Sequence, residues 1–584
     1  MAKVLLIFFL QLGATFLFSQ TINTDAKAAT MLAEGKTQFG QNKFAEASET
    51  FENSLLRPFN TLTTTAMYLS GIASYYNHDW VNAQYRLNQL ITAYPKSKYV
   101  GDAQYHLALS EMNGANPQMQ AMGLERMYAL REMMKEIPLA ITNEAKQASK
   151  IYAFNHLSSA VVEKFYQKAP EKIKLELMEA VCYHYLKEGN ENEAQVTYQN
   201  HLNEGKSSSP FVENMLRNAA TSAPNIRMAA PIVTIAVMLP FFSPDNTMDI
   251  DTMDYTPANS QMALELYEGF MEGVNTYSQF SKKKYFIKVF DTKRDNYTLE
   301  RQLQELEIMQ PDMIIGEIYN KQSRLIAEWT SQHAVTQLVP LSPTRSLIEN
   351  RKNVFLLNPS TTTHGYKMAE YAYRDLGLRK VTVWTDSRTS TSALANAFAA
   401  RFQVMGGTPI IALIDSVYDL AQPQILQSKD KFTNSEGMYI PINNEETVGL
   451  MLSLIDANRY KIKVMALPDI ELYEQIEREV KEICGVYFTT AYTPQVESEG
   501  YQSYFDTHLL NYNSPPTEYH IRGYDMGQYI SRVWDDYNGG DFNQFLRDYV
   551  PAYGIHLEYD FNREQDNQGV RVQQYTEEGV ITVK

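Results

Sequence analysis

The chain has 584 residues, which is too many for a single hydrophobic core, so we expect two or three domains. Its formal net charge of −16 argues against a nucleic-acid-binding protein, which needs a basic face, and disfavours docking on an anionic membrane surface. The two cysteines, Cys182 and Cys484, lie in different predicted domains, and no CxxC pair or Cys/His cluster indicates a zinc site.

The first twenty residues, MAKVLLIFFLQLGATFLFSQ, predict a secretory signal peptide over residues 1–20. Lys3 precedes an apolar run, and small residues follow it, with a cut expected near Ser19 and Gln20. No cysteine lies at that cut, so the sequence predicts no lipid anchor there. An uncleaved N-terminal anchor is the alternative, although the apolar run is short for a membrane span. We expect a periplasmic or cell-envelope protein whose mature chain does not span the membrane.

Residues 25–218 predict an all-α helical-repeat domain. Gly35 is followed twelve residues later by Ala47 and four residues after that by Phe51. The same offsets recur in two further sets, Gly71, Ala83 and Leu87, and Cys182, Ala194 and Tyr198. Small residues let two antiparallel helices approach closely, and the large residue fills the gap between repeats. This spacing resembles the tetratricopeptide repeat, and the resemblance is poor over about 110–175.

Such repeats leave a concave surface that commonly holds a peptide or a partner protein. We therefore predict an envelope protein partner bound through the helical repeats. The alternative is that the repeats form a rigid spacer, and the sequence does not decide between the two.

A linker is predicted at 219–231 and an α/β domain at 232–584. The segment IVTIAVMLPFF is a β-branched apolar run typical of a buried parallel strand. Strands and helices then alternate, which predicts parallel sheets covered by helices on both faces. Strands are expected at 285–290, 313–315, 336–341, 381–384, 410–414, 437–442, 463–466 and 485–489.

Many short segments of this domain, taken in order, resemble the type I periplasmic binding fold of leucine/isoleucine/valine-binding proteins. IAVMLPFF resembles the opening strand, PDMIIGEIYNKQS a strand and its ligand turn, LVPLSPTRS the next strand and loop, and NVFLLNPSTTTHGYKMAEYA the crossover into a second lobe. HIRGYDMGQYI resembles the helix after the chain returns. The resemblance implies one lobe of about 232–357 and 490–537, and another of about 358–489 and 538–584, joined by a hinge that closes around ligand.

The same resemblance implies a ligand site between the lobes. In this family, hydroxyl and backbone N–H groups hold a ligand carboxylate, and the second lobe brings an acidic and an aromatic group to the ammonium end. By position, the expected ligand-binding residues are Tyr319, Asn320, Ser323, Ser342, Thr344, Asp386, Arg388, Asn443 and Glu445. For each serine and threonine the alternative is a helix cap, the usual role of these residues where a strand turns into a helix.

No constellation in the sequence predicts an enzyme, a cofactor or a metal. GxSxG, HExxH and phosphate-binding GxxxxGK motifs do not occur. The acidic run DNTMDIDTMD, residues 245–254, lacks the spacing of a defined calcium loop, and we interpret it as a solvated loop.

Helical repeats ahead of a type I binding fold resemble, in their order, the LpoA-type activators of penicillin-binding proteins. The resemblance implies a non-catalytic scaffold or regulator acting by protein contact, in peptidoglycan synthesis. The alternative is a solute-binding protein that delivers an amino acid or small amide to an ABC transporter.

Overall fold

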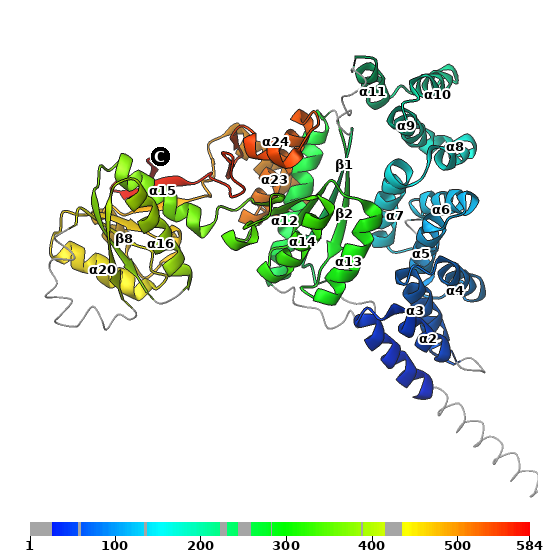
Figure 1. The fold of residues 1–584 in the computed structure, drawn as a ribbon, viewed down its shortest axis with the longest axis horizontal. Coiled ribbons are helices and arrows are strands. Elements are labelled where there is room, and N and C mark those ends of the chain that lie inside the picture. The colour runs from blue at the N-terminus through cyan, green and yellow to red at the C-terminus, as the bar shows by residue number, and fades with distance from the viewer. Residues whose placement is uncertain are drawn as a thin grey trace, which may run out of the picture. The chain divides into compact units, whose positions relative to one another are not determined.

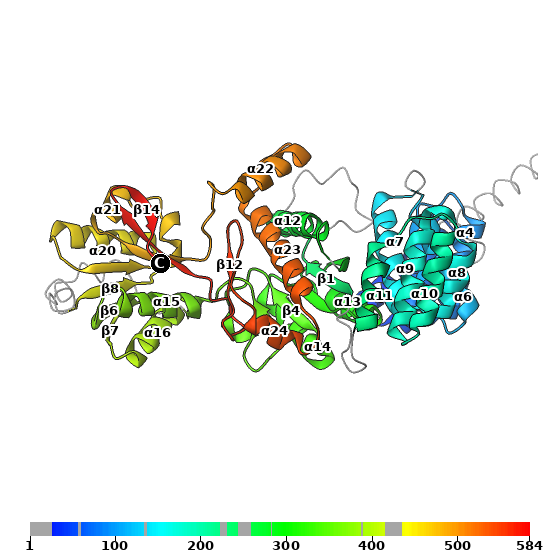
Figure 2. The same cartoon turned by 90° about the horizontal axis from the view of Figure 1, so that it is seen from above.

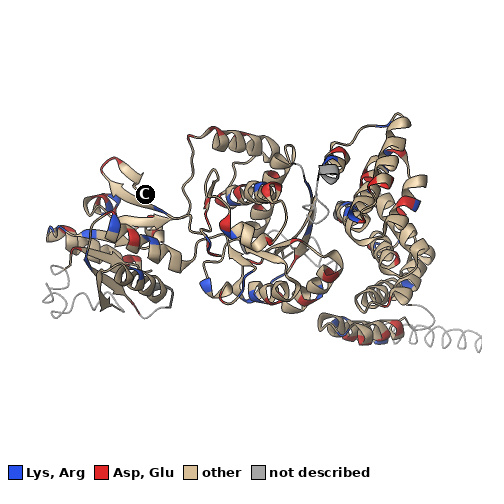
Figure 3. Ribbon diagram, turned by 45° about the horizontal axis from the view of Figure 1, so that its top comes forward, with Lys and Arg blue, Asp and Glu red and all other residues tan. Residues whose placement is uncertain are grey.

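The computed structural model describes residues 26–55, 60–133, 137–221, 231–242, 258–281, 283–386, 389–414 and 435–584. The predicted signal peptide and most of the predicted linker lie outside these ranges. The chain forms two compact units: one runs to Met238 and includes Lys282–Asp312, and the other comprises Leu239–Ser281 and Met313–Lys584. Among the described helices, none has the length and apolar character that crossing a membrane requires. Figure 3 shows acidic and basic residues interspersed over the described helices of both units.

The first unit is a stack of helices that also contains two strands and one helix from the α/β part of the chain (Figure 1). After a helix at 26–40, its helices are α2 (Phe44–Asn53), α3 (Thr63–Tyr76), α4 (Trp80–Ala93), α5 (Val100–Asn113), α6 (Pro117–Leu130), α7 (Leu139–Ile151), the π-helix η1 (Tyr152–His156), α8 (Ser159–Lys168), α9 (Glu171–Lys187), α10 (Glu191–Asn203) and α11 (Pro210–Thr221). The strands β1 (Ile232–Leu239) and β2 (Lys284–Asp291) and the helix α13 (Asn296–Met309) complete it. The predicted boundary at 219–231 lies where the sequence changes from helices to strands. The compact unit extends beyond that boundary, because β1, β2 and α13 pack with the helices.

The repeated small and large residues pack helices against each other in this stack. A Cβ atom on Gly35 would lie 2.6 Å from Cε1 of Phe51, and one on Gly71 would lie 2.7 Å from Leu87. In the last pair of the array, the Cys182 thiol lies 3.5 Å from the carbonyl oxygen of Ala194. The offsets in the sequence therefore correspond to contacts between paired helices.

The second unit contains the remaining helices and strands. In chain order they are α12 (Ala258–Ser278), β3 (Met313–Gly316), α14 (Asn320–His333), β4 (Thr336–Val339), η3 (Arg345–Leu347), β5 (Val354–Leu356), α15 (Thr361–Arg374), β6 (Lys380–Thr385), α16 (Thr389–Val404), β7 (Thr408–Leu413), β8 (Gly437–Ile440), α20 (Glu445–Ala457), β9 (Lys463–Ala466), η4 (Pro468–Leu472), α21 (Arg478–Ile483), β10 (Tyr487–Thr490), α22 (Glu499–Tyr512), α23 (Glu518–Asp536), α24 (Phe542–Asp548), β11 (Ala552–Tyr553), β12 (Glu558–Tyr559), β13 (Arg571–Thr576) and β14 (Gly579–Thr582).

The strands form a five-stranded sheet of order β2-β1-β3-β4-β5 and a seven-stranded sheet of order β14-β13-β10-β9-β8-β6-β7. The pairs β3–β4, β4–β5, β6–β7, β6–β8, β8–β9 and β9–β10 are parallel, and the two C-terminal strands add an antiparallel edge at β10. A helical region followed by an α/β region with parallel strands is the predicted fold class, which is confirmed. The short strands β11 to β14 are not part of the prediction.

Two glycine pairs bring α12 and α23 into backbone contact (Figures 1 and 2). Gly269 and Gly273 lie one turn apart on α12, and Gly523 and Gly527 do so on α23. A Cβ atom at Gly269 would lie 1.9 Å from the carbonyl oxygen of His520. Helix α23, which follows the return of the chain from the second sheet, is therefore fixed directly on α12.

Residues after α23 contact strands of both sheets. The backbone N–H of Leu356, in β5, donates to Gln565 O at 2.8 Å, and the Thr336 hydroxyl donates to Asn543 at 2.8 Å. Residues 571–582, in contrast, form β13 and β14 in the seven-stranded sheet. The predicted lobe boundaries stay a prediction, and the segment 538–584 divides between the two sheets.

Candidate functional site

The second unit contains a cavity of about 570 Å³ near the points where the chain crosses between the two sheets. Its lining comes from the β5–α15 crossover, from the β10–α22 crossover, from α23 and from the segment around η4. The lining residues are Pro343, Asn358, Pro359, Thr361, His364, Leu394, Pro441, Asn443, Leu467, Pro468, Asp469, Glu471, Leu472, Thr490, Ala491, Tyr492, Glu518, Tyr519, Arg522 and His556. Several of these follow the C-terminal ends of parallel strands, where α/β folds commonly bind ligands.

One wall of the cavity is organised around Tyr492. Its hydroxyl donates to Oδ1 of Asn358 at 2.5 Å. The guanidinium of Arg522 lies 3.4 Å from the centroid of the Tyr492 ring and also forms an ion pair with Glu518. Cation–π contact and ion pairing both hold the Arg522 side chain within the wall.

Two histidines line this cavity, and in the described part of the chain one has a hydrogen-bond partner and one has none. Nδ1 of His364 lies 3.0 Å from the Thr489 hydroxyl, and burial lowers the pKa of His364 to about 4, so the ring is neutral at pH 7. His556 is 7% exposed, and neither ring nitrogen has a hydrogen-bond partner among the described residues. Its Nε2 lies 4.0 Å from Oε1 of Glu518, beyond hydrogen-bond distance.

The η4 segment contributes two carboxylates to the lining, Asp469 and Glu471. Burial raises the pKa of both side chains, and for Glu471 the nearby Lys481 partly opposes the effect. Neither carboxylate has an ion-pair or hydrogen-bond partner within the described parts of the chain. The ammonium of Lys481 itself donates to the backbone carbonyl oxygens of Ile470 and Tyr473, at 3.0 and 2.7 Å.

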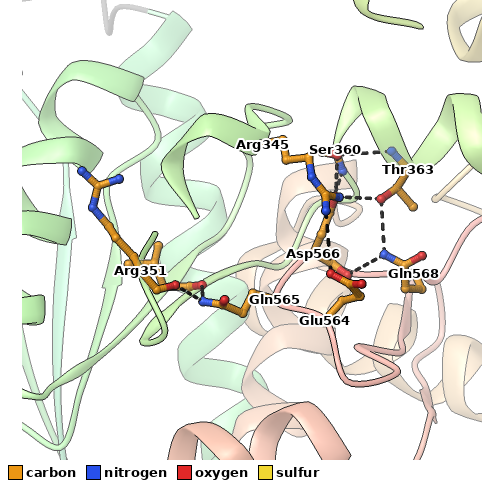
Figure 4. A network of polar contacts seen from close by, with 9 residues as sticks. Arg345, Arg351, Ser360, Thr363, Glu564, Gln565, Asp566 and Gln568 are labelled. Carbon is orange, nitrogen blue, oxygen red and sulfur yellow. Dashed lines mark hydrogen bonds and ion pairs between the residues drawn. The ribbon is translucent and has the colours of Figure 1, made fainter. Parts of the chain in front are cut away.

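A buried aspartate fixes the crossings behind the cavity (Figure 4). Asp566 is fully buried and accepts hydrogen bonds from the Ser360 backbone N–H and hydroxyl and from the Thr363 hydroxyl, at 2.8, 2.5 and 2.7 Å. Arg345 donates to the same carboxylate at 3.1 Å. Because Ser360 and Thr363 open α15, Asp566 ties the last crossing of the chain to the start of that helix.

A second buried aspartate positions His556. Asp525, on α23, accepts from the backbone N–H groups of Ile555, His556 and Leu557 at 2.8, 2.9 and 2.9 Å. Burial raises the pKa of Asp525 to about 6, although these three donors favour its ionised form. The β11–β12 hairpin, and with it His556, is thus held by one carboxylate.

This arrangement predicts a pH-dependent contribution to stability. The pKa of Asp525 is about 6 in the folded chain against an ordinary value of 3.8, so the folded state binds the proton more tightly between these values. The free energy of unfolding should therefore fall as the pH rises from about 4 to about 6, by roughly 2–3 kcal/mol from this group. Denaturant titrations from pH 4 to 7 measure the slope, and Asp525→Asn should lack this part of it. If the free energy of unfolding changed equally with pH in wild type and Asp525→Asn, the pH dependence could not be assigned to Asp525.

Of the described residues predicted to bind ligand, one lines the cavity and the others do not. Asn443 lines the cavity, where its Oδ1 accepts from the Tyr473 hydroxyl at 3.2 Å. The other described members of the set are not among the lining residues, namely Tyr319, Asn320, Ser323, Ser342, Thr344, Asp386 and Glu445. Arg388 lies outside the described residues.

The hydroxyl groups expected to hold a carboxylate form internal hydrogen bonds. Ser323 is fully buried and donates to the carbonyl oxygen of Glu317 at 2.5 Å. Ser342 donates to Asn320 at 2.5 Å and accepts from the backbone N–H of Thr344 at 3.2 Å. Both hydroxyls are thus engaged in hydrogen bonds within the fold, and neither caps the N-terminus of α14 or η3.

Sequence reasoning did not select the charged cavity residues Asp469, Glu471, Arg522 and His556. HIRGYD, which contains Arg522, was matched only as a helix after the chain returns. PDIE, which contains Asp469 and Glu471, follows the strand at 463–466, so the strand-end rule could have indicated it. His556 follows no motif. Within the described residues no three His, Cys, Asp or Glu side chains are grouped to hold a metal, and the acidic run 245–254 lies outside them.

The first unit has a separate feature, a buried polar cluster on the inner face of the helical array. Lys288, on β2, donates to Glu305, on α13, at 3.1 Å, and the Tyr76 hydroxyl, on α3, donates to the other Glu305 oxygen at 2.9 Å. The side chains of Lys288 and Glu305 are 16% and 20% exposed. A cavity of about 30 Å³ beside them has room for a single water.

Burial and neighbouring charge together decide the ionisation of this cluster. Burial alone would lower the pKa of Lys288, but the neighbouring Tyr105, Glu305 and Glu144 outweigh it and raise that pKa well above its ordinary value. Burial would raise the pKa of Glu305, yet Lys288 and the Tyr76 hydroxyl hold it below its ordinary value. The pair is therefore ionised at neutral pH.

Further contacts extend this attachment along the array. Asn42 donates to the carbonyl oxygen of Tyr297 and to Glu300, both at 3.3 Å. The rings of Phe154 and Phe286 are 5.2 Å apart, edge to face. The sequence leaves the concave face open for a partner, whereas the structure places β2 and α13 of the same unit on this inner face.

No family model matches the chain, and no curated protein matches it. Among solved structures, full-length LpoA from Haemophilus influenzae is similar over 97% of this chain and 96% of its own, with 14% identity and a TM-score of 0.44. An ABC transporter substrate-binding protein from Desulfitobacterium hafniense in complex with leucine covers 60% of this chain and 100% of its own, with 18% identity and a TM-score of 0.41. The one from Sphaerobacter thermophilus covers 60% and 96%, with 13% identity and a TM-score of 0.43.

Proposed function

We propose that the protein is an exported, non-catalytic scaffold or regulator of the cell envelope that acts by protein–protein contact. The observation that carries this proposal is the attachment of the helical array to β2 and α13 through the Lys288–Glu305 cluster. An array joined to an α/β sheet by buried ionic and aromatic contacts is held firmly rather than tethered by a linker. Its outer face is then presented in a fixed orientation within the first unit.

The outer face offers apolar side chains for a partner. On α4, Ala83, Leu87 and Leu90 are buried, while Val81 and Tyr85 are 76% and 60% exposed. These two residues are four apart and so lie on one side of the helix. With the inner face occupied, the outer side of α4 is where we place contact with a partner.

The process that best fits this proposal is peptidoglycan synthesis. Its support is the resemblance in domain order to the LpoA-type activators, together with the signal peptide predicted at 1–20. The partner would then be a penicillin-binding protein in the periplasm, stimulated by contact and not by chemistry.

A test is to measure binding of the purified protein to penicillin-binding proteins of its own organism, and their glycan polymerisation and cross-linking rates. We expect wild-type protein to bind and raise a rate, and Val81→Glu with Tyr85→Glu to weaken binding at least tenfold, because two charges enter an apolar contact. The matched control is Leu510→Glu with Val550→Glu, which are 84% and 68% exposed in the other unit. Failure of wild type to bind, or equal loss in both variants, would contradict the proposal.

A second candidate is a solute-binding protein for an amino acid or small amide that serves an ABC transporter. The cavity of about 570 Å³ in the second unit favours it, since a volume of this size accommodates a small metabolite. The predicted ligand residues, from Tyr319 to Glu445, belong to this candidate and stay predictions. A ligand that binds only the folded chain should raise its melting temperature.

A further inference from the structure

The charges that line the cavity of the second unit are unbalanced. Asp469, Glu471 and Glu518 are acidic, Arg522 is the cation among the lining residues, and His364 is neutral at pH 7. Since Glu518 and Arg522 pair with each other, the surplus is two carboxylates on the η4 wall. Their side chains are exposed to the cavity and have no ion-pair partner in the described structure. A cation entering the cavity would stabilise both.

A second observation points independently to a ligand. His556 lines the same cavity, is 7% exposed, and both of its ring nitrogens lack a hydrogen-bond partner among the described residues. Each ring nitrogen of an imidazole is a hydrogen-bonding group, and burying both of them unpaired costs free energy. Asp525 fixes the backbone at this histidine, so the ring is presented in place and is not a mobile surface group. A ligand with its own donor and acceptor would satisfy it.

We propose that this cavity binds a small organic cation, whose protonated amine meets Asp469 and Glu471 and whose other polar group meets His556. The volume of about 570 Å³ fits an amine of several carbons and not merely a metal ion. This ligand class differs from the amino acid or small amide expected from the sequence, because the hydroxyls of Ser323 and Ser342, predicted to hold a carboxylate, donate to Glu317 and Asn320 instead.

The inference rests on the premise of the second candidate function, that the cavity binds a small molecule. It adds the chemical class of the ligand, and it assigns ligand recognition to Asp469, Glu471 and His556. It does not depend on whether the helical array binds a partner protein.

Isothermal titration of the full mature chain with spermidine, agmatine and leucine tests it. We expect spermidine or agmatine to bind at micromolar concentration, at least tenfold more tightly than leucine, and more weakly as salt rises. Asp469→Asn with Glu471→Gln should weaken amine binding at least tenfold. Both side chains are exposed to the open cavity, so we expect these variants to fold with an unchanged melting temperature.

The matched control is Glu474→Gln with Glu479→Gln, which removes the same charge from exposed positions outside the cavity lining. If amines bind equally to both double variants, the attraction is that of an acidic protein in general and the proposal is wrong. If leucine binds and Asp469→Asn with Glu471→Gln leaves its affinity unchanged, the ligand class is wrong while the solute-binding candidate stands. If neither amine binds, the proposal of a small organic cation is wrong, whether or not the cavity takes another solute.

Discussion

Replacing Lys288 with Met should lower the free energy of unfolding of the first unit by about 2–4 kcal/mol. The substitution leaves the mostly buried Glu305 carboxylate with the Tyr76 hydroxyl as its one remaining hydrogen-bond donor among the described residues. Removing one partner of a buried ion pair is costly because the remaining charge has lost its compensation. Denaturant unfolding followed by far-ultraviolet circular dichroism measures the change, since this unit is mainly helical.

Two further variants separate the ion pair from general effects of the substitution. Replacing Lys288 and Glu305 both by Met should recover much of the loss, because no unpaired charge is left behind. Lys168→Met removes one half of the Lys168–Glu125 pair, whose side chains are 52% and 51% exposed, and should change stability by less than about 1 kcal/mol. A loss as large for Lys168 as for Lys288 would show that the buried cluster has no special role.

Local sequence patterns were sufficient for the fold class. The offset from Gly71 to Leu87 predicts a helix pair because only a residue without a side chain leaves room for the leucine, and the structure has that contact. The apolar run at Ile232 predicts a buried strand for a similar reason, since every residue of β1 is buried. Both signals depend on neighbours within the same or the next element, which the sequence order itself supplies.

The cavity could not be predicted to the same extent, because strand ends indicate many turns and not which of them face one space. Ser323 and Ser342 follow strand ends as expected, yet their hydroxyls bond to Glu317 and Asn320. Asp469 follows another strand end and lines the cavity. Which carboxylate or hydroxyl is left for a ligand depends on hydrogen bonds across the fold, and a spacing rule does not contain them.

The same reasoning applies to the helical array. A repeat pattern predicts a concave face, but what covers that face is decided by residues far along the chain. Lys288 and Glu305 lie more than 200 residues beyond Tyr76, and no local pattern marks them as its partners. This long-range packing moves our proposed partner site from the inner face to Val81 and Tyr85 on the outer one.

Gly269→Ala should destabilise the second unit by about 3 kcal/mol or more, as an overpacked core does at the upper end of its range. The new methyl group would lie 1.9 Å from the carbonyl oxygen of His520, and backbone atoms on α23 cannot move aside as a flexible side chain can. Gly523→Ala meets the carbonyl oxygen of Leu266 at 2.2 Å and should act in the same direction. Soluble yield and thermal unfolding measure both variants.

The matched control for the α12–α23 contact is Gly40→Ala. A methyl group there meets no atom within 4 Å, and alanine favours a helix over glycine, so the variant should be unchanged or more stable by up to about 1 kcal/mol. Because Gly269 and Gly523 also fix the helix that carries Glu518 and Arg522, their replacement should weaken ligand binding in the cavity as well as stability. If Gly269→Ala has the same melting temperature as the wild-type protein, α12 and α23 are not in backbone contact. The cavity wall built on α23 must then be placed differently.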